Sequence, residues 1–261
     1  MKTQPSLPLD IKLMNLTSSA LILVSGVLML AAMAAWAAQH PLFAIAGMTV
    51  RGDVSHNNAV TLRANVAARF SGTFFTLDLK RAQSVFESVP WIRRAVVQRE
   101  FPNRLRVILQ EHQPVGYWGL EGESRLINSH GEVFEANVGE IEQESLPRMY
   151  GPEDQAGAVL QMYQQLTPVF EAVDLLIEQI DLSGRGSWRL RLDSGAVIEL
   201  GRGSGEELIT RLQRFLGALT QVTGKYGRKL NALESADLRY SEGFAVRIRG
   251  VSTVLPDGQK K

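Results

Sequence analysis

The stretch PWIRRAVVQREFPNRLRVILQEHQPVGYW, Pro90 to Trp118, decides how the first half of this chain folds. Apolar and polar residues alternate along it on both sides of the turn dipeptide Pro102–Asn103, and this period of two is typical of strands with one buried face. The apolar positions are Ala95, Val97, Leu105, Val107 and Leu109. The stretch therefore predicts an antiparallel hairpin that turns at Phe101–Arg104.

The same stretch is rich in arginine, with Glu100 as the one acid among five arginines. They are Arg93, Arg94, Arg99, Arg104 and Arg106. The alternatives are an anion or nucleic-acid surface, or the solvated outer face of the hairpin. The whole chain has 28 Lys and Arg against 27 Asp and Glu, so it has no general excess of positive charge to hold a polyanion. We favour the solvated face, with Arg94, Arg99, Arg104 and Arg106 toward water, and we expect no nucleic-acid partner.

A long uncharged segment precedes this region. No Asp, Glu, Lys or Arg occurs from Leu13 to Val50, and Leu16 to Ala38 is apolar apart from Ser, Thr and Gly. About 20 helical residues cross the hydrocarbon core, and Trp36 falls where an interfacial ring is favoured. The tail before the span carries two lysines, whereas the next charge after it is Arg51. The positive-inside rule then keeps the N-terminus in the cytoplasm and exports the rest.

A cleaved signal peptide is the alternative for this segment, because AWA at Ala35–Ala37 fits a small-x-small cleavage site. The apolar run is longer than the roughly 7–15 residues of a signal core, so we favour a retained helix. The chain has no cysteine, which excludes disulfides, cysteine–zinc sites and a cysteine nucleophile but is compatible with either redox compartment.

The residues between the span and the hairpin predict a strand followed by two helices. MTVRG, ending at Gly52, reads as a strand. Asn57 or Asn58 can cap a helix that runs to about Phe70. Asp78 caps a second helix, which Pro90 ends. The predicted order is β-α-α-β-β.

The second half predicts a separate mixture of strands and helices. We expect a hairpin turning at Asn128–Gly131, a helix from about Glu153, and a helix whose apolar stripe is Leu208, Leu212, Phe215, Leu219 and Val222. The expected strands are Ile177–Leu182, Trp188–Asp193, Ala196–Leu200, Ala236–Tyr240 and Phe244–Arg249.

No catalytic or metal-binding pattern emerges from the sequence. The four histidines, His40, His56, His112 and His130, do not pair at metal-ligand spacing. GRGSG at Gly201–Gly205 follows a strand and opens a helix, a context that suits phosphate, but it matches neither phosphate-binding motif, so we favour a tight turn. We therefore expect no enzyme, no cofactor and no metal.

Several motifs resemble one family. SVPWIRRAVVQREFPNRLRVILQEHQPVGYW resembles the end of the POTRA domain of the FtsQ/DivIB family of bacterial cell-division proteins, and SRLINSHGEVFE, LPRMYGPE, GSWRLRLDSGAVIELGRG, RLQRF and ADLRYSEGFAVR resemble its β domain in order. The resemblance covers roughly Phe43 to Arg249 and implies an α+β chain with one N-terminal transmembrane helix, a POTRA domain and a mixed α+β domain with an antiparallel-rich sheet. The boundaries we expect are a cytoplasmic tail over 1–15, a transmembrane helix over 16–38, a POTRA domain over 43–115, a β domain over 116–250 and a disordered tail over 251–261.

The resemblance also implies a function. The family is a non-enzymatic scaffold of the divisome that links early and late division proteins. It implies an inner-membrane protein at the septum, whose POTRA domain contacts other division proteins such as FtsK and whose last strand binds FtsB and FtsL. The partner-binding residues that it implies are Arg185, Arg239, Tyr240, Gly243, Phe244, Ala245, Val246 and Ile248. The segment RIRG after Val246 is more charged than in some other members, and a packed strand pair is the alternative for Arg239 and Tyr240.

Two other functions predict different sequence features. An outer-membrane assembly or secretion accessory would carry tandem POTRA repeats or a β-barrel of alternating strands, and the sequence shows neither. A cell-wall enzyme would carry paired carboxylates or a nucleophile with its base. The binding scaffold is the function that we favour.

Overall fold

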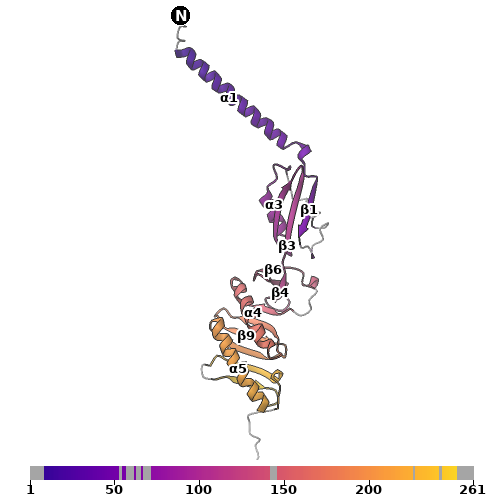
Figure 1. Ribbon diagram of the computed structural model, residues 1–261, viewed down its shortest axis with the longest axis vertical. Coiled ribbons are helices and arrows are strands. Elements are labelled where there is room, and N and C mark those ends of the chain that lie inside the picture. The colour runs from indigo at the N-terminus through magenta and orange to yellow at the C-terminus, as the bar shows by residue number, and fades with distance from the viewer. Residues whose placement is uncertain are drawn as a thin grey trace, which may run out of the picture. The chain divides into compact units, whose positions relative to one another are not determined.

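A computed structural model describes residues 9–52, 55–56, 62, 66, 72–141, 146–225, 227–240 and 243–251. The chain divides into two compact units, Met1–Glu111 and His112–Lys261, each with its own hydrophobic core (Figure 1). The predicted α+β class with an N-terminal apolar helix is confirmed.

The first unit begins with the long helix α1, Leu9–Ala38, followed by a short 3-10 turn, Pro41–Phe43. Leu13–Ala38 has a mean hydropathy of 2.3, and none of the residues in its most apolar window is buried against protein. Among the described residues this is the one helix long and apolar enough to cross a membrane. It fits a single-pass membrane protein.

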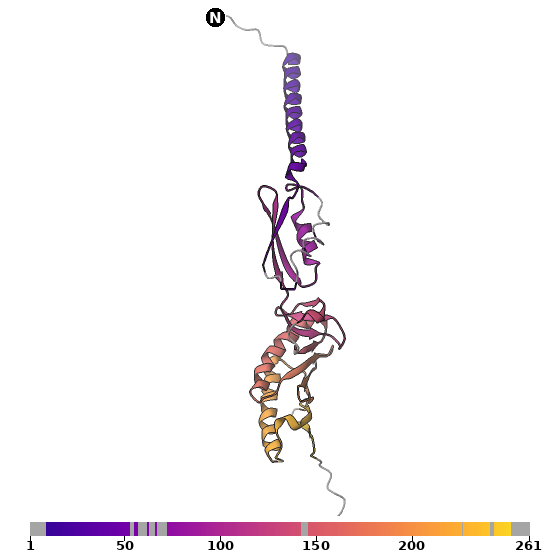
Figure 2. The same cartoon turned by 90° about the vertical axis from the view of Figure 1, so that its right-hand side faces the viewer.

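The described part of the first unit also contains a three-stranded sheet with the helix α3 on one side (Figure 2). Its elements are β1 (Gly47–Gly52), α3 (Leu79–Glu87), β2 (Ile92–Glu100) and β3 (Arg104–Glu111). The strand order is β1-β3-β2, with β1 parallel and β2 antiparallel to β3. The Asp78 side chain accepts hydrogen bonds from the N–H groups of Lys80 and Arg81, so the predicted cap of α3 is confirmed.

The hairpin prediction is also confirmed. All five predicted apolar positions are buried, and four of them, Ala95, Val97, Val107 and Leu109, belong to the core that α3 also joins. The expected helix from Asn57 or Asn58 to Phe70 lies outside the described residues except at Leu62 and Val66, which are helical and buried.

The arginines of the hairpin divide into two kinds. Arg94 and Arg104 are exposed, as predicted. Arg99 is exposed too, but its guanidinium donates to the carbonyl oxygens of Phe74, Phe75 and Leu77 at 2.6, 3.3 and 2.7 Å. Arg106 is only half-exposed and pairs with Glu100. Two of the four arginines therefore hold local structure as well as facing water.

The second unit is built on a nine-stranded mixed sheet with the order β12-β11-β10-β9-β8-β7-β4-β5-β6. The strands are β4 (Pro114–Trp118), β5 (Arg125–Asn128), β6 (Val133–Glu135), β7 (Arg148–Tyr150), β8 (Ile177–Leu182), β9 (Trp188–Leu192), β10 (Val197–Gly201), β11 (Leu233–Asp237) and β12 (Ala245–Ile248). The helices are α4 (Ala156–Glu171) and α5 (Gly205–Lys225), and 3-10 turns occur at Val138–Glu140, Glu153–Gln155 and Leu230–Ala232.

Both long helices lie on the same side of this sheet (Figure 2), and the main core fills the space between the layers. Leu166 and Phe170 of α4 and Phe215 of α5 are fully buried there, and each such side chain contributes about 1.5–3 kcal/mol by leaving water. The opposite face is polar, with Arg189 of β9 donating to Glu199 of β10 at 2.6 Å. The sheet therefore presents a charged surface to solvent.

The predicted stripe of α5 is wrong at its last position. Val222 is 41% exposed, whereas Thr223 is buried. Steps of three and four residues keep to one helix face, and the step from Leu219 to Thr223 continues the stripe better than the step to Val222. The Thr223 hydroxyl donates to the Leu219 carbonyl at 2.9 Å, so its burial leaves no polar atom without a partner.

Two further corrections concern strand bounds. The predicted strand Ala236–Tyr240 is instead β11, Leu233–Asp237, so Arg239 and Tyr240 lie beyond its end. The strands β4 and β7 were not expected, and they pair in parallel at Tyr117–Arg148 and Trp118–Met149. The predicted hairpin at Asn128–Gly131 is confirmed as the β5–β6 connection.

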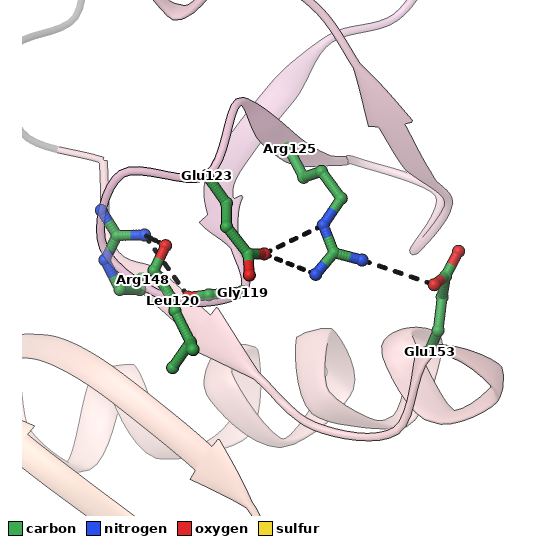
Figure 3. A network of polar contacts seen from close by, with 6 residues as sticks. All are labelled: Gly119, Leu120, Glu123, Arg125, Arg148 and Glu153. Carbon is green, nitrogen blue, oxygen red and sulfur yellow. Dashed lines mark hydrogen bonds and ion pairs between the residues drawn. The ribbon is translucent and has the colours of Figure 1, made fainter.

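A polar network stabilises the part of the sheet that carries β4 and β7 (Figure 3). The Arg125 guanidinium donates to Glu123 at 3.0 Å and reaches Glu153 at 3.5 Å. The same guanidinium lowers the pKa of Glu123 through the hydrogen bond. Arg148 of β7 donates to the carbonyl of Leu120 at 3.0 Å, so the turn after β4 is fastened to two neighbouring segments.

Candidate functional site

The strand β12 forms one edge of the nine-stranded sheet. It pairs antiparallel with β11, with Val246 opposite Ala236 and Arg247 opposite Ser235. In the described part of the chain no strand lies on its other side. An edge of this kind leaves backbone donors and acceptors available to another extended segment.

The register shows which backbone groups of β12 face outward. The N–H of Arg249 donates to the Ala232 carbonyl at 2.8 Å, on the β11 side. Successive residues of an antiparallel strand direct their N–H and C=O groups alternately to the two sides. Ile248 and Val246 therefore present their backbone groups at the free edge, whereas Arg247 and Ala245 bond to β11.

The side chains of β12 divide between the two faces of the sheet. Ile248 is 7% exposed and joins the main core, and Val246 on the same side is 40% exposed. Arg247 points to the polar face, where it approaches Glu234 at 3.6 Å. On that face a hollow of about 360 Å³ extends over β10, β11 and β12. A strand added beside β12 would therefore contact Val246 and Ile248 on the core face of the sheet and the charged Arg247 on its polar face.

A bidentate ion pair lies just past the end of β11. Arg239 Nε and Nη2 donate to Asp237 Oδ1 and Oδ2 at 2.9 and 2.6 Å, and the Arg239 N–H donates to Oδ1 at 3.1 Å. These hydrogen bonds lower the pKa of Asp237 and raise the pKa of Arg239. The pair fixes the path of the chain as it leaves β11 toward the edge.

Gly201 lets the Arg239 side chain lie close to the end of β10. Its φ of +81° is in the left-handed region, and a Cβ atom at this position would lie 2.9 Å from Arg239 Cγ. A larger residue would both strain the backbone and displace the arginine stem. The glycine of this tight turn thus also serves the neighbouring loop.

Aromatic residues border a second hollow of about 570 Å³ between this loop and α5. Tyr240 is 62% exposed, whereas the ring of Phe244 packs edge-on against the buried Phe215 at 5.4 Å. Gly243 also lines the hollow, and the helix contributes charged residues to it, among them Arg211 and Arg214. The hollow therefore combines an exposed aromatic ring with charges of both signs.

Seven of the eight expected site residues lie together on β12 and the loop before it. The exception is Arg185, which is exposed in the β8–β9 turn. Pairing of Trp188 with Gly201 and of Glu199 with Asp237 places that turn at the same end of the sheet as Arg239, on the far side of β10. The contribution of Arg211 and Arg214 from α5 was not expected, although their spacing of three puts them on one helix face.

Two family models match successive parts of the chain, and these parts correspond to the two folded units. The family model described as POTRA domain, FtsQ-type, matches residues 43–112. The model described as Cell division protein FtsQ/DivIB, C-terminal, matches residues 116–239.

Curated relatives match over nearly the whole chain. A protein of Burkholderia pseudomallei named Cell division protein FtsQ is 39% identical over 243 residues, which is 93% of this chain and 94% of that protein. A protein of the same name from Thiomonas arsenitoxydans is 38% identical, with 94% of this chain and 90% of that protein covered. One from Bordetella pertussis is 35% identical, with 92% of each chain covered.

Proposed function

This chain belongs to the FtsQ/DivIB family of bacterial cell-division proteins, and from that premise we propose that the free edge of β12 is the place where it joins the division machinery. The family is a non-enzymatic scaffold family, so the chain is a POTRA-containing division protein and not an enzyme. The proposal concerns where and how it binds.

The partner in this proposal is the periplasmic part of FtsB and FtsL. An extended segment of that pair adds to β12 as a further strand, held by the outward N–H and C=O groups of Val246 and Ile248. The observation that carries the proposal is the position of β12 at the sheet edge, with no described strand beyond it. Main-chain bonds supply affinity without regard to the partner's sequence, so specificity falls to side chains beside the edge.

Those side chains gather at one end of β12. Tyr240 offers an exposed ring, and the hollow beside it has room for a residue that follows the added strand. Arg185 extends from a neighbouring turn and offers a cationic group to an acidic partner segment, whereas Arg239 is paired with Asp237 and holds the loop that carries Tyr240. Gly243, Phe244 and Ala245 lead the chain into the edge strand.

We also propose how the chain is oriented in the membrane and which partners its POTRA domain contacts. The N-terminus lies in the cytoplasm, α1 crosses the inner membrane, and both folded units lie in the periplasm at the septum. The POTRA domain, over residues 43–115, contacts other divisome proteins such as FtsK, and the β domain over 116–250 contacts FtsB and FtsL. The charge difference across α1 and the family membership support this arrangement.

The test is a binding titration of the full chain in detergent with the periplasmic segments of FtsB and FtsL. Val246→Pro removes an outward N–H but no bond to β11, so the fold should survive. We expect its affinity to fall by at least about 2 kcal/mol, the size of an interface hot spot. Val246→Ala keeps the N–H and is the matched control. A Val246→Pro protein that melts like the parent and binds as tightly would refute the edge-strand mechanism.

A further inference from the structure

The end of α1 is fastened directly to the POTRA unit. The Thr73 hydroxyl donates to the carbonyl of Ala38, the last residue of α1, at 2.6 Å. The Phe74 N–H donates to the Phe43 carbonyl at 2.7 Å, and Ala44 forms an isolated β-bridge with Thr73. The chain therefore passes from the span into the folded unit through bonded contacts rather than a free linker.

Three large apolar side chains are exposed around this attachment. Leu42 is 77% exposed, Phe75 is 49% exposed and Phe101 is 79% exposed. The Phe75 ring packs edge-on against Phe43 at 4.9 Å, and Phe74 lies edge-on to Phe101 at 6.4 Å. We call Leu42, Phe75 and Phe101 the apolar tip. It differs from scattered surface residues because its members come from separate segments and gather where the span ends.

Hydrogen bonds hold the backbone beneath the apolar tip. The Arg99 guanidinium donates to the carbonyls of Phe74 and Phe75, which fixes the segment that carries Phe75. The Ala46 N–H donates to the Asn103 carbonyl at 2.9 Å, which ties the β2–β3 turn to the chain that leaves α1. The exposed rings are therefore presented by a supported surface.

We propose that the apolar tip rests in the interfacial zone of the bilayer that α1 spans. Trp36, two residues before the end of α1, is 70% exposed, and aromatic rings are favoured at the level of the lipid headgroups. The contacts from Ala38 and Phe43 keep Phe75 within a short distance of that level. The partner of the tip is the lipid itself, and the argument rests on α1 being the membrane span.

The charges near the tip suit this position. Arg104 follows Phe101 in the turn and is exposed, and Lys80 near the start of α3 is exposed as well. Cations at this depth can meet lipid phosphates. Two acids lie in the same segments: Glu100 is paired with Arg106, and Asp78 accepts hydrogen bonds from the N–H groups of Lys80 and Arg81 at the start of α3. Seating of the tip would hold the POTRA unit at a set height and orientation above the membrane.

The test uses the absence of cysteine in the chain, which allows a single label without further changes. Phe101→Cys and Phe75→Cys carry a nitroxide in the full-length protein, one copy per lipid nanodisc. Collision rates with oxygen, which concentrates in lipid, are compared with those of a water-soluble nickel chelate. The matched control is Ile108→Cys, an apolar residue 41% exposed in the middle of the same hairpin. It lies four residues from Arg104, or about 13 Å along the strand.

We expect the oxygen-to-nickel ratio at positions 75 and 101 to exceed that at position 108 by at least about twofold, as for side chains inserted 5–10 Å into the interface. Melting curves of the labelled proteins establish that each remains folded. Only lipid and one copy are present, so a tip that instead binds another protein or a second copy would give the same ratio at all three positions. That result would overturn the proposal.

Discussion

Arg239 donates two parallel hydrogen bonds to Asp237, 2.9 Å from Nε to Oδ1 and 2.6 Å from Nη2 to Oδ2, at the point where the chain leaves β11 for the sheet edge. Two-point pairing fixes the plane of the guanidinium as well as its distance. The pair thus holds the loop that carries Tyr240 beside the free strand. It links the stability of this loop to the charge on one carboxylate.

Acid should loosen this loop in a predictable way. Because the hydrogen bond from Arg239 lowers the pKa of Asp237 below its ordinary value of 3.8, the pair stabilises the fold at pH above that value. The stabilisation is lost as the pH falls through the folded-state pKa. Asp237→Asn should remove this part of the pH dependence, so that its melting temperature and that of the parent converge below about pH 4.

Melting curves between neutral and acid pH provide the measurement. The control is Glu178→Gln, which removes one exposed carboxylate on β8 and leaves the Asp237–Arg239 pair in place, so the loss of melting temperature that this pair causes in acid should persist. If the difference between Asp237→Asn and the parent is the same at all pH values, the ion pair does not contribute as described.

Gly131 in the β5–β6 turn should tolerate no side chain. Its φ is +78°, and a Cβ atom there would lie 2.7 Å from the backbone of Gly157 in α4. Gly131→Ala should cost more than the roughly 1–3 kcal/mol of backbone strain alone. Gly122, with φ of +90° and no atom within 4 Å, isolates the strain. Urea unfolding should show a larger loss for Gly131→Ala than for Gly122→Ala, and equal losses would mean that the α4 contact is unimportant.

Much of the fold follows from local pattern, and the exceptions have physical causes. The hairpin at Phe101–Arg104 and the stripe of α5 were predictable because many alternating or helically spaced residues repeat the same signal. The strand β7, Arg148–Tyr150, has three residues, too few to show a period of two. The predicted strand extends past the end of β11 because Leu238, beyond that end, is buried and its N–H still donates to the Glu199 carbonyl, as in a strand.

The candidate site was only partly accessible to sequence reasoning. We expect the final predicted strand to lie at a sheet edge, and among the described strands β12 is outermost in its sheet. The register that turns Val246 outward depends on the bond between Arg249 and Ala232, which no local pattern reveals. The approach of Arg211 from α5 is likewise a tertiary contact. The roles of the eight site residues stay predictions.

Arg99 should stabilise the segment before α3 through its three carbonyl contacts. Arg99→Lys keeps the charge but loses the planar fork that reaches Phe74, Phe75 and Leu77 together. We expect a loss of about 1–2 kcal/mol in the free energy of unfolding. Amide hydrogen exchange over residues 73–77 should accelerate. Arg94→Lys is the control, because Arg94 is exposed on the same strand, and similar exchange in both variants would contradict the bracing role of Arg99.

Tyr240 should matter for binding and little for stability. Its ring is 62% exposed beside the free edge, so its removal leaves no cavity in the core. An exposed aromatic that becomes buried by a partner is the usual form of an interface anchor, and Tyr240→Ala should weaken binding of the FtsB and FtsL segments by about 2 kcal/mol. Its melting temperature should stay within a degree or so of the parent, since exposed substitutions change stability by only about 0.5 kcal/mol.

Tyr150 on β7 is the matched control for this experiment, as a tyrosine 41% exposed that lies several strands away from β12. Tyr150→Ala removes the same chemical group and should leave the affinity unchanged. Equal affinity losses in the two variants would indicate a general effect on the sheet rather than a contact at its edge. If neither variant loses affinity, the binding surface does not include the hollow that Tyr240 borders. The backbone of β12 would then still be tested through Val246→Pro.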